Sequence, residues 1–205
     1  MNTTNDSPRR EVSKIIGLTG GIGSGKSSVA KILETKGYPV YYSDDRAKVI
    51  VNEDEVLKDQ IKSLLGSEAY DQQGNYDRKF VSNLVFNNTE LLEQLNRLIH
   101  PAVKLDFEKW WMAQTSEFSF KETALLFELE LDKSCYKSLL VTADENLRIK
   151  RVMDRDGKTY REVERVVDQQ MPEKIKIKKA NYVIYNNSDF VALSQEVDQF
   201  ISELN

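Results

Sequence analysis

Apolar residues along this chain form two kinds of pattern, short uninterrupted runs and longer stretches that repeat every three to four residues. The uninterrupted runs lie at residues 14–19, 39–42, 122–127, 137–142 and 181–185. Runs of this length are typical of strands that are buried on both faces. The periodic stretches between them predict amphipathic helices. The last helix is the clearest, with apolar positions at Phe190, Leu193, Val197, Phe200, Ile201 and Leu204.

This alternation of strands and helices predicts right-handed βαβ units. We therefore expect an α/β fold with three layers, in which helices cover both faces of a parallel five-stranded sheet. The 205 residues suit one such domain with insertions and can bury a sizeable core.

The first turn after the first strand has a recognisable phosphate-binding pattern. Residues 20–27 read Gly-Gly-Ile-Gly-Ser-Gly-Lys-Ser, between the run at 14–19 and a helical stretch at 28–36. Glycines let successive backbone N–H groups point at an anion, the lysine reaches the outer phosphates, and the serine hydroxyl suits Mg²⁺. A flexible glycine turn is the alternative. The strand before the loop and the helix after it favour a nucleotide site on the helix N-terminus.

Two long stretches between the strand runs predict insertions. Residues 46–118 are mostly helical, and Pro101 is expected to break or redirect a helix that reaches His100. Residues 148–180 are rich in Lys and Arg, with Arg148, Arg151 and Arg155 spaced to share one helix face. A solvated face with ion pairs to Asp154, Asp156 and Glu164 is the alternative. Because a triphosphate needs more cations than one lysine supplies, we expect a lid that closes over it.

The second strand run ends in Ser43-Asp44-Asp45. A carboxylate at the carboxyl end of a parallel strand lies in the ligand crevice of this fold class. Asp44 is therefore a candidate to accept a proton from an attacking hydroxyl. The alternative is that one of these side chains only caps the helix that follows, and position alone does not separate the two.

Composition narrows the possible partners. The net charge of −4 gives no reason to expect a nucleic-acid surface, although a local basic patch stays possible. One cysteine (Cys135) and one histidine (His100) exclude an intrachain disulfide and make a zinc site of the usual kind unexpected. Residues 1–13 are polar, and no segment is apolar enough for a secretory signal or a bilayer span. The sequence therefore predicts a cytoplasmic protein with no membrane partner, and it does not indicate an oligomeric state.

From residue 15 to about residue 188, the chain resembles the dephospho-coenzyme A kinases, a family of P-loop kinases. The resemblance rests on ordered elements: Leu18-Thr19-Gly20-Gly21-Ile22-Gly23-Ser24-Gly25-Lys26-Ser27, Tyr42-Ser43-Asp44, Tyr76-Asp77-Arg78, Leu98-Ile99-His100-Pro101, Ala124-Leu125-Leu126-Phe127-Glu128, Arg151-Val152-Met153-Asp154-Arg155-Asp156, Gln170, Lys176, Ala180 and Val183-Ile184-Tyr185-Asn186. Three positions depart from the family pattern. Tyr42 and Asn181 stand where the family has aspartates, and Ala124 stands where it has proline.

The resemblance implies that ATP phosphorylates the ribose 3′-hydroxyl of dephospho-coenzyme A, with Mg²⁺ as cofactor. It implies a nucleotide-binding core at 14–45, 119–147 and 181–205, an acceptor subdomain at 46–118 and a lid at 148–180. The implied catalytic residues are Asp44, Lys26 and Arg151. The implied ATP-binding residues are Gly23, Ser24, Gly25, Lys26, Ser27, Ser28, Arg155 and Asn186, with Ser27 also on the metal. Glu122 is a further candidate to act on the metal through water.

Arg78, His100 and Glu128 are the implied acceptor-binding residues. Each has a plainer explanation, since Arg78 suits a solvated surface, His100 a helix junction and Glu128 a helix start. Two other functions stay open. One is another small-metabolite or nucleoside-monophosphate kinase, and the other is a GTPase-like switch, although no clear Asn-Lys-x-Asp guanine-reading motif is found in the chain.

Overall fold

The computed structural model of the chain describes residues 12–86 and 88–204. The chain divides into two compact units. The first unit contains residues up to Val40 and from Trp111 onward, and the second unit is Tyr41–Trp110. Among the described residues, no helix is long and apolar enough to cross a membrane.

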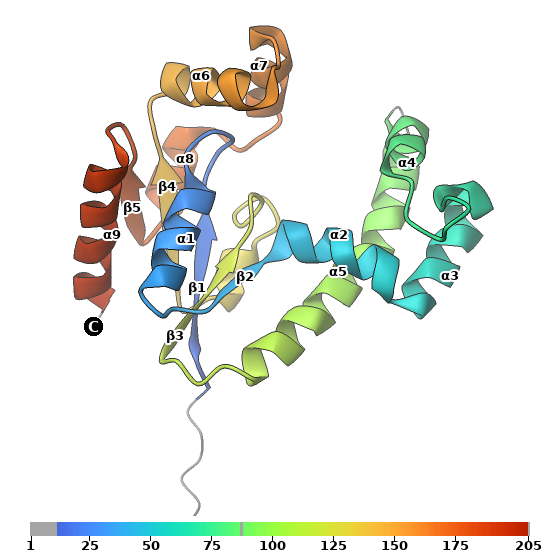
Figure 1. Cartoon of the computed structure of the whole chain (residues 1–205), viewed down its shortest axis with the longest axis horizontal. Coiled ribbons are helices and arrows are strands. Elements are labelled where there is room, and N and C mark those ends of the chain that lie inside the picture. Colours follow the sequence, from blue (N-terminus) through green and yellow to red (C-terminus); the bar gives the residue numbers. More distant parts are fainter. Residues whose placement is uncertain (1–11, 87, 205) are drawn as a thin grey trace, which may run out of the picture. The chain divides into compact units, whose positions relative to one another are not determined.

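The chain contains a five-stranded sheet (Figure 1). Its strands are β1 (Lys14–Thr19), β2 (Val40–Tyr42), β3 (Phe118–Glu122), β4 (Lys137–Thr142) and β5 (Tyr182–Tyr185), in the spatial order β2-β3-β1-β4-β5. All of these strands lie within the first unit except β2, which continues into the second unit. β1 pairs in parallel with β3 and β4, and β4 pairs in parallel with β5. The predicted parallel five-stranded α/β fold is confirmed.

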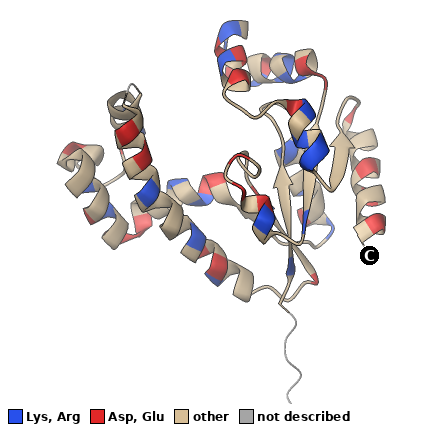
Figure 2. Ribbon diagram, turned by 180° about the vertical axis from the view of Figure 1, so that it is seen from behind, with Lys and Arg blue, Asp and Glu red and all other residues tan. Residues whose placement is uncertain are grey.

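Helices cover both faces of this sheet. The first unit contains α1 (Lys26–Thr35), the short turn η2 (Leu131–Ser134), α6 (Glu145–Asp156), α7 (Tyr160–Asp168), α8 (Glu173–Lys179) and α9 (Phe190–Leu204). α1 and α9 pack together on one face, where the rings of Phe120 and Phe200 meet edge to face. α8 lies behind β4 in Figure 1 and in front of the sheet in Figure 2, so it covers the opposite face. Parallel strands need this two-sided cover because both of their faces are apolar.

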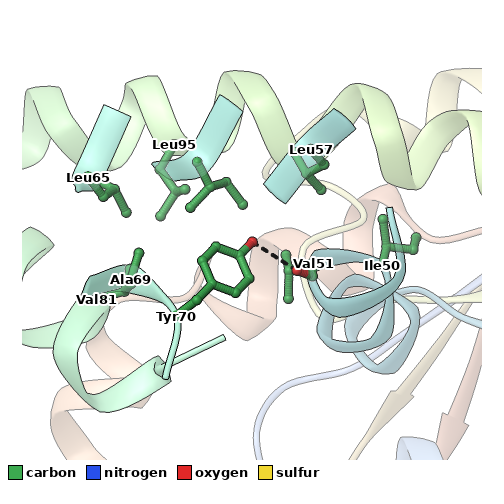
Figure 3. Packing of buried hydrophobic residues seen from close by; sticks show 9 residues of the cluster. Ile50, Val51, Leu57, Leu65, Ala69, Tyr70, Val81 and Leu95 are labelled. Carbon is green, nitrogen blue, oxygen red and sulfur yellow. Dashed lines mark hydrogen bonds between the residues drawn. The ribbon is translucent and has the colours of Figure 1, made fainter. Parts of the chain in front are cut away.

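The second unit is helical, with a core of its own. It contains α2 (Ser43–Glu53), α3 (Glu55–Leu65), the turn η1 (Ser67–Ala69), α4 (Arg78–Val85) and most of α5 (Thr89–Met112). Figure 3 shows the apolar side chains that these elements bring together, among them Leu57, Leu95 and Tyr70. The Tyr70 hydroxyl donates a 2.9 Å hydrogen bond to the Val51 carbonyl inside this cluster, which satisfies its one polar atom.

Two sequence-based boundaries are wrong. The run at 122–127 is not a strand, because β3 ends at Glu122 and residues 124–130 form turns. Leu126 and Phe127 are buried but lie in turns, so the apolar run indicates burial and does not indicate a strand. Pro101 does not break the helix, because α5 continues through it to Met112. Arg97, His100 and Pro101 are exposed, so water can solvate the carbonyl that the proline leaves without a donor.

Phe190 is a third correction, because it belongs to the predicted core stripe of the last helix but is exposed. It is the first residue of α9, one turn before the buried positions begin. Leu193, Val197 and Phe200 are buried as the spacing predicts.

Candidate active site

The loop between β1 and α1 owes its shape to two glycines with a left-handed backbone. Gly23 has φ of 76° and Gly25 has φ of 93°, a region that other residues enter only with strain. Both glycines also lack room for a side chain. A Cβ at Gly23 would collide with the backbone of Arg148, and a Cβ at Gly25 would collide with the amide of Asn186.

This loop leaves the N-terminus of α1 open. The helix begins at Lys26 with Gly25 as its N-cap, and Gly25 has no side chain that could bond the first amides. Its first turn contains no acidic residue. The glycine cap and the positive end of the helix dipole suit an anion at this terminus, where the sequence predicts the phosphate site.

Lys26 forms an ion pair with Glu122, the last residue of β3. Both side chains are largely buried, with exposed fractions of 12% for Lys26 and 6% for Glu122. A buried charge is stable only when it is paired. Glu122 thus neutralises the loop lysine. The sequence placed an acid near the metal but gave no sign of this pairing, which depends on β3 lying next to β1.

Asn186 braces the loop from the far end of the sequence. Its side-chain Nδ2 donates a 2.8 Å hydrogen bond to the Ser24 carbonyl, and its backbone N–H donates to Thr142 O at 2.7 Å. The residue is only 7% exposed. In this structure the predicted ATP-binding residue Asn186 therefore contacts the loop backbone itself.

The three arginines of α6 lie in different environments. Arg148 is 3% exposed, and its guanidinium lies against Gly21 of the loop. Arg151 is partly buried, with Nη1 enclosed and without a hydrogen-bond partner. Arg155 is exposed and forms a two-bond pair with Asp156, which raises the pKa of Arg155 and lowers the pKa of Asp156. Figure 2 shows that α6 and α7 carry charges of both signs, so part of the solvated-face alternative is realised.

Glu128 lies after β3 in the first unit. Its Oε1 accepts a 3.0 Å hydrogen bond from the Met171 N–H and lies 3.5 Å from Nζ of Lys176, which is fully buried. These contacts tie the turn after β3 to the start of α8. They give Glu128 a packing role beside the acceptor-binding role that the sequence predicts.

Asp44, Arg78 and His100 belong to the second unit, and all three side chains are exposed. Asp44 lies in the first turn of α2, directly after β2. The N-cap of α2 is Tyr42, and it makes no side-chain capping bond. The capping alternative for residues 43–45 is therefore not what the structure contains. Arg78 begins α4, whose cap is Asp77, and His100 lies within α5.

A polar cluster in the second unit escaped the sequence analysis. Asp106 accepts hydrogen bonds from the Tyr41 hydroxyl at 2.7 Å and from two nitrogens of Arg46 at 2.9 and 2.7 Å. The bonds from Arg46 lower the pKa of Asp106, and burial raises the pKa of Tyr41. Arg46 and Asp106 are 60 positions apart, so no local spacing could reveal this cluster.

The Ser27 hydroxyl is the protein group in the phosphate loop whose chemistry suits Mg²⁺. Ser27 is exposed in the first turn of α1 and offers a hard oxygen ligand. In the described part of the chain, no group of three or more His, Cys, Asp or Glu residues could hold a metal ion. Mg²⁺ commonly binds through one or two protein oxygens together with substrate phosphates and water, which suits such a site.

Comparison with known proteins identifies the family to which the chain is similar. The family model for dephospho-CoA kinase matches residues 14–192. The chain is 40% identical to a dephospho-CoA kinase of Fusobacterium nucleatum over 91% of this chain and 96% of that protein. It is 37% identical to a dephospho-CoA kinase of Leptospira interrogans, over 93% and 92% of the two chains. Among solved structures, TT1252 from Thermus thermophilus gives a TM-score of 0.84 at 33% identity, covering 95% of this chain and all of that one.

The glycine geometry makes a prediction about the loop. We expect Gly23→Ala to reduce stability by about 1–2 kcal/mol through its positive φ. We also expect it to raise the KM for ATP at least about tenfold, because the new methyl group displaces the loop from Arg148. Gly37→Ala is the control, since Gly37 also has a positive φ but an added Cβ there meets nothing within 4 Å. Urea unfolding should detect strain in both variants, and an unchanged KM in Gly23→Ala would contradict the collision.

Proposed function

The chain belongs to the dephospho-CoA kinase family, and on that premise we propose that it transfers the γ-phosphoryl group of ATP to the ribose 3′-hydroxyl of dephospho-coenzyme A. The products are coenzyme A and ADP, and the reaction is the last step of coenzyme A synthesis. The observation that carries the proposal is the open N-terminus of α1, with Lys26 beside it. Because the reaction consumes ATP, it supports the cytoplasmic location that the sequence predicts.

The loop residues supply charge and position. The amides of Gly25, Lys26 and Ser27 face the phosphates, and Lys26 exchanges its pairing with Glu122 for the outer phosphates. Glu122, at the end of β3, would then act on the metal through water, the role for which it is a candidate from the sequence. The Ser27 hydroxyl would hold Mg²⁺, which would neutralise phosphate charge as it does in other phosphoryl transfer enzymes.

The transfer itself is a displacement at phosphorus. The 3′-oxygen of the acceptor forms a bond to the γ-phosphorus while the bond between the γ-phosphorus and the β,γ-bridging oxygen breaks, and ADP leaves with that oxygen. Asp44 accepts the proton of the 3′-hydroxyl. Arg151 and Arg155 neutralise charge that spreads over the transferred group, as lid arginines do in this kind of transfer. Arg155 must leave Asp156 to do so, which costs little because that pair is exposed.

The second unit supplies the acceptor site. Arg78 presents a cation at the start of α4 and suits the acceptor's phosphates, and exposed His100 on α5 suits the wall of the same site. Glu128 would have to act while it also holds Met171 and Lys176. Arg78 and His100 are therefore the better supported acceptor residues.

A substrate panel tests the proposal. ADP release is measured with dephospho-coenzyme A, AMP, CMP and shikimate, and we expect turnover with dephospho-coenzyme A alone. Phosphorus NMR of the product should detect a 3′-phosphomonoester. Turnover only with a nucleoside monophosphate would replace the proposal with a nucleoside-monophosphate kinase. Binding of GTP in preference to ATP, without transfer to any acceptor, would indicate a switch.

The base assignment gives a second prediction. We expect Asp44→Asn to lower kcat by about 10²–10⁴-fold, because the amide cannot accept the hydroxyl proton. The KM for ATP should stay within about twofold, since Asp44 does not hold the phosphates in this proposal. Asp45→Asn is the matched control, because Asp45 is the next residue, is also exposed, and pairs with Lys48 on the surface of α2. Equal kcat values for the two variants would remove Asp44 from the mechanism.

A further inference from the structure

Ile22 of the phosphate loop contacts the predicted lid segment, residues 148–180. The Ile22 backbone N–H donates a 3.0 Å hydrogen bond to Oε1 of Gln170, a residue 148 positions later in the chain. The Ile22 side chain packs against the buried cluster of Ile149, Val152 and Val163 from α6 and α7. One loop residue therefore joins the lid through its backbone and through its side chain.

The neighbouring glycines make contact with the same segment. A Cβ at Gly21 would collide with the guanidinium of Arg148 and lie 3.4 Å from Oε1 of Gln170. A Cβ at Gly23 would collide with the Arg148 backbone. Gly21, Ile22 and Gly23 thus fit closely into a surface made by Arg148 and Gln170, at the two ends of the α6–α7 hairpin.

Gln170 is held in place by its own backbone neighbours. Its N–H donates to Val167 O at 3.0 Å, at the end of α7. The next N–H, that of Met171, donates to Glu128, which lies beside the fully buried Lys176. Because bonds fix the backbone on both sides, the Gln170 amide carbonyl is oriented before any ligand arrives.

We propose that Gln170 is a positioning residue for phosphoryl transfer. It fixes the Ile22 amide, and through it the curvature of the loop that presents the amides of Gly25–Ser27 to phosphate. The same contact joins the loop to the α6–α7 segment, which contains Arg151. Binding of the phosphates by the loop is therefore coupled to the position of Arg151. The proposal rests on the proposed function, and Gln170 acts through Ile22 without touching the substrate.

The test uses two adjacent glutamines. Gln170→Leu removes the acceptor at nearly constant size, and Gln170→Ala removes it without adding apolar surface. Gln169→Leu is the control, because Gln169 is exposed and immediately precedes Gln170. Hydrogen exchange at the Ile22 amide and steady-state kinetics with ATP and dephospho-coenzyme A are measured on the full chain.

We expect both Gln170 variants to speed exchange at Ile22 by about tenfold or more. The KM for ATP should rise about five- to tenfold, on the scale of one lost hydrogen bond, while the KM for dephospho-coenzyme A stays within about twofold. Gln169→Leu should match the unmodified chain in all three quantities. A purely structural role would lower thermal stability and kcat without this selective change in the ATP constant.

Two results would overturn the proposal. Unchanged exchange at Ile22 in both Gln170 variants would show that the hydrogen bond does not hold the loop. Faster exchange with an unchanged KM for ATP would show that the bond does not serve the reaction. Failure of the proposed function is a different result, because the unmodified chain would then transfer no phosphoryl group to dephospho-coenzyme A while exchange at Ile22 still responded to Gln170.

Discussion

The site depends on one constraint, that α1 begins at the phosphate loop with a glycine as its N-cap. Gly25 has no side chain to bond the first amides, and the first turn contains no acidic residue. Such a terminus is stabilised when it meets an anion. Lys26 adds a charge that the protein keeps neutral through buried Glu122. A phosphate group that enters the loop therefore meets the positive end of the helix dipole and a lysine whose partner is a neighbouring carboxylate.

Segments far apart in sequence hold the loop in this shape. Asn186, after β5, bonds the Ser24 carbonyl, and Arg148, at the start of the lid segment, packs against Gly21 and Gly23. Gln170, at the end of the same segment, bonds the Ile22 amide. Residues that follow β5 and residues at both ends of the α6–α7 segment therefore contact the same loop. These contacts also show a second reason for glycine at positions 21 and 23, because a side chain there would collide with Arg148.

The pattern of apolar residues along the chain predicted those elements whose structure depends on neighbouring residues. Two strand runs, 14–19 and 137–142, coincide with β1 and β4 because continuous apolarity marks strands buried on both faces. The phosphate loop could be predicted because its glycines, lysine and serine lie between a strand and a helix, where an anion site is favoured over a flexible turn. The strand predicted at 122–127 is wrong because a buried turn can contain the same apolar residues as a buried strand. The helix break predicted at Pro101 is wrong because the carbonyl that loses its donor belongs to exposed Arg97 and can bond water. The pairing of Lys26 with Glu122, and the contact of Ile22 with Gln170, arise from tertiary packing, and no spacing in the sequence encodes them.

Calorimetric titration with ATP and Mg²⁺ tests the central claim most directly, using the unmodified chain, Lys26→Ala and Lys31→Ala. Lys31 is exposed on the same helix and is the matched cation outside the loop. The account predicts equal Kd values for the unmodified chain and Lys31→Ala, and a Kd at least about tenfold higher for Lys26→Ala, as loss of a charge-assisted contact to phosphate requires. Equal affinity in all three proteins, or no heat with the unmodified chain, would contradict it.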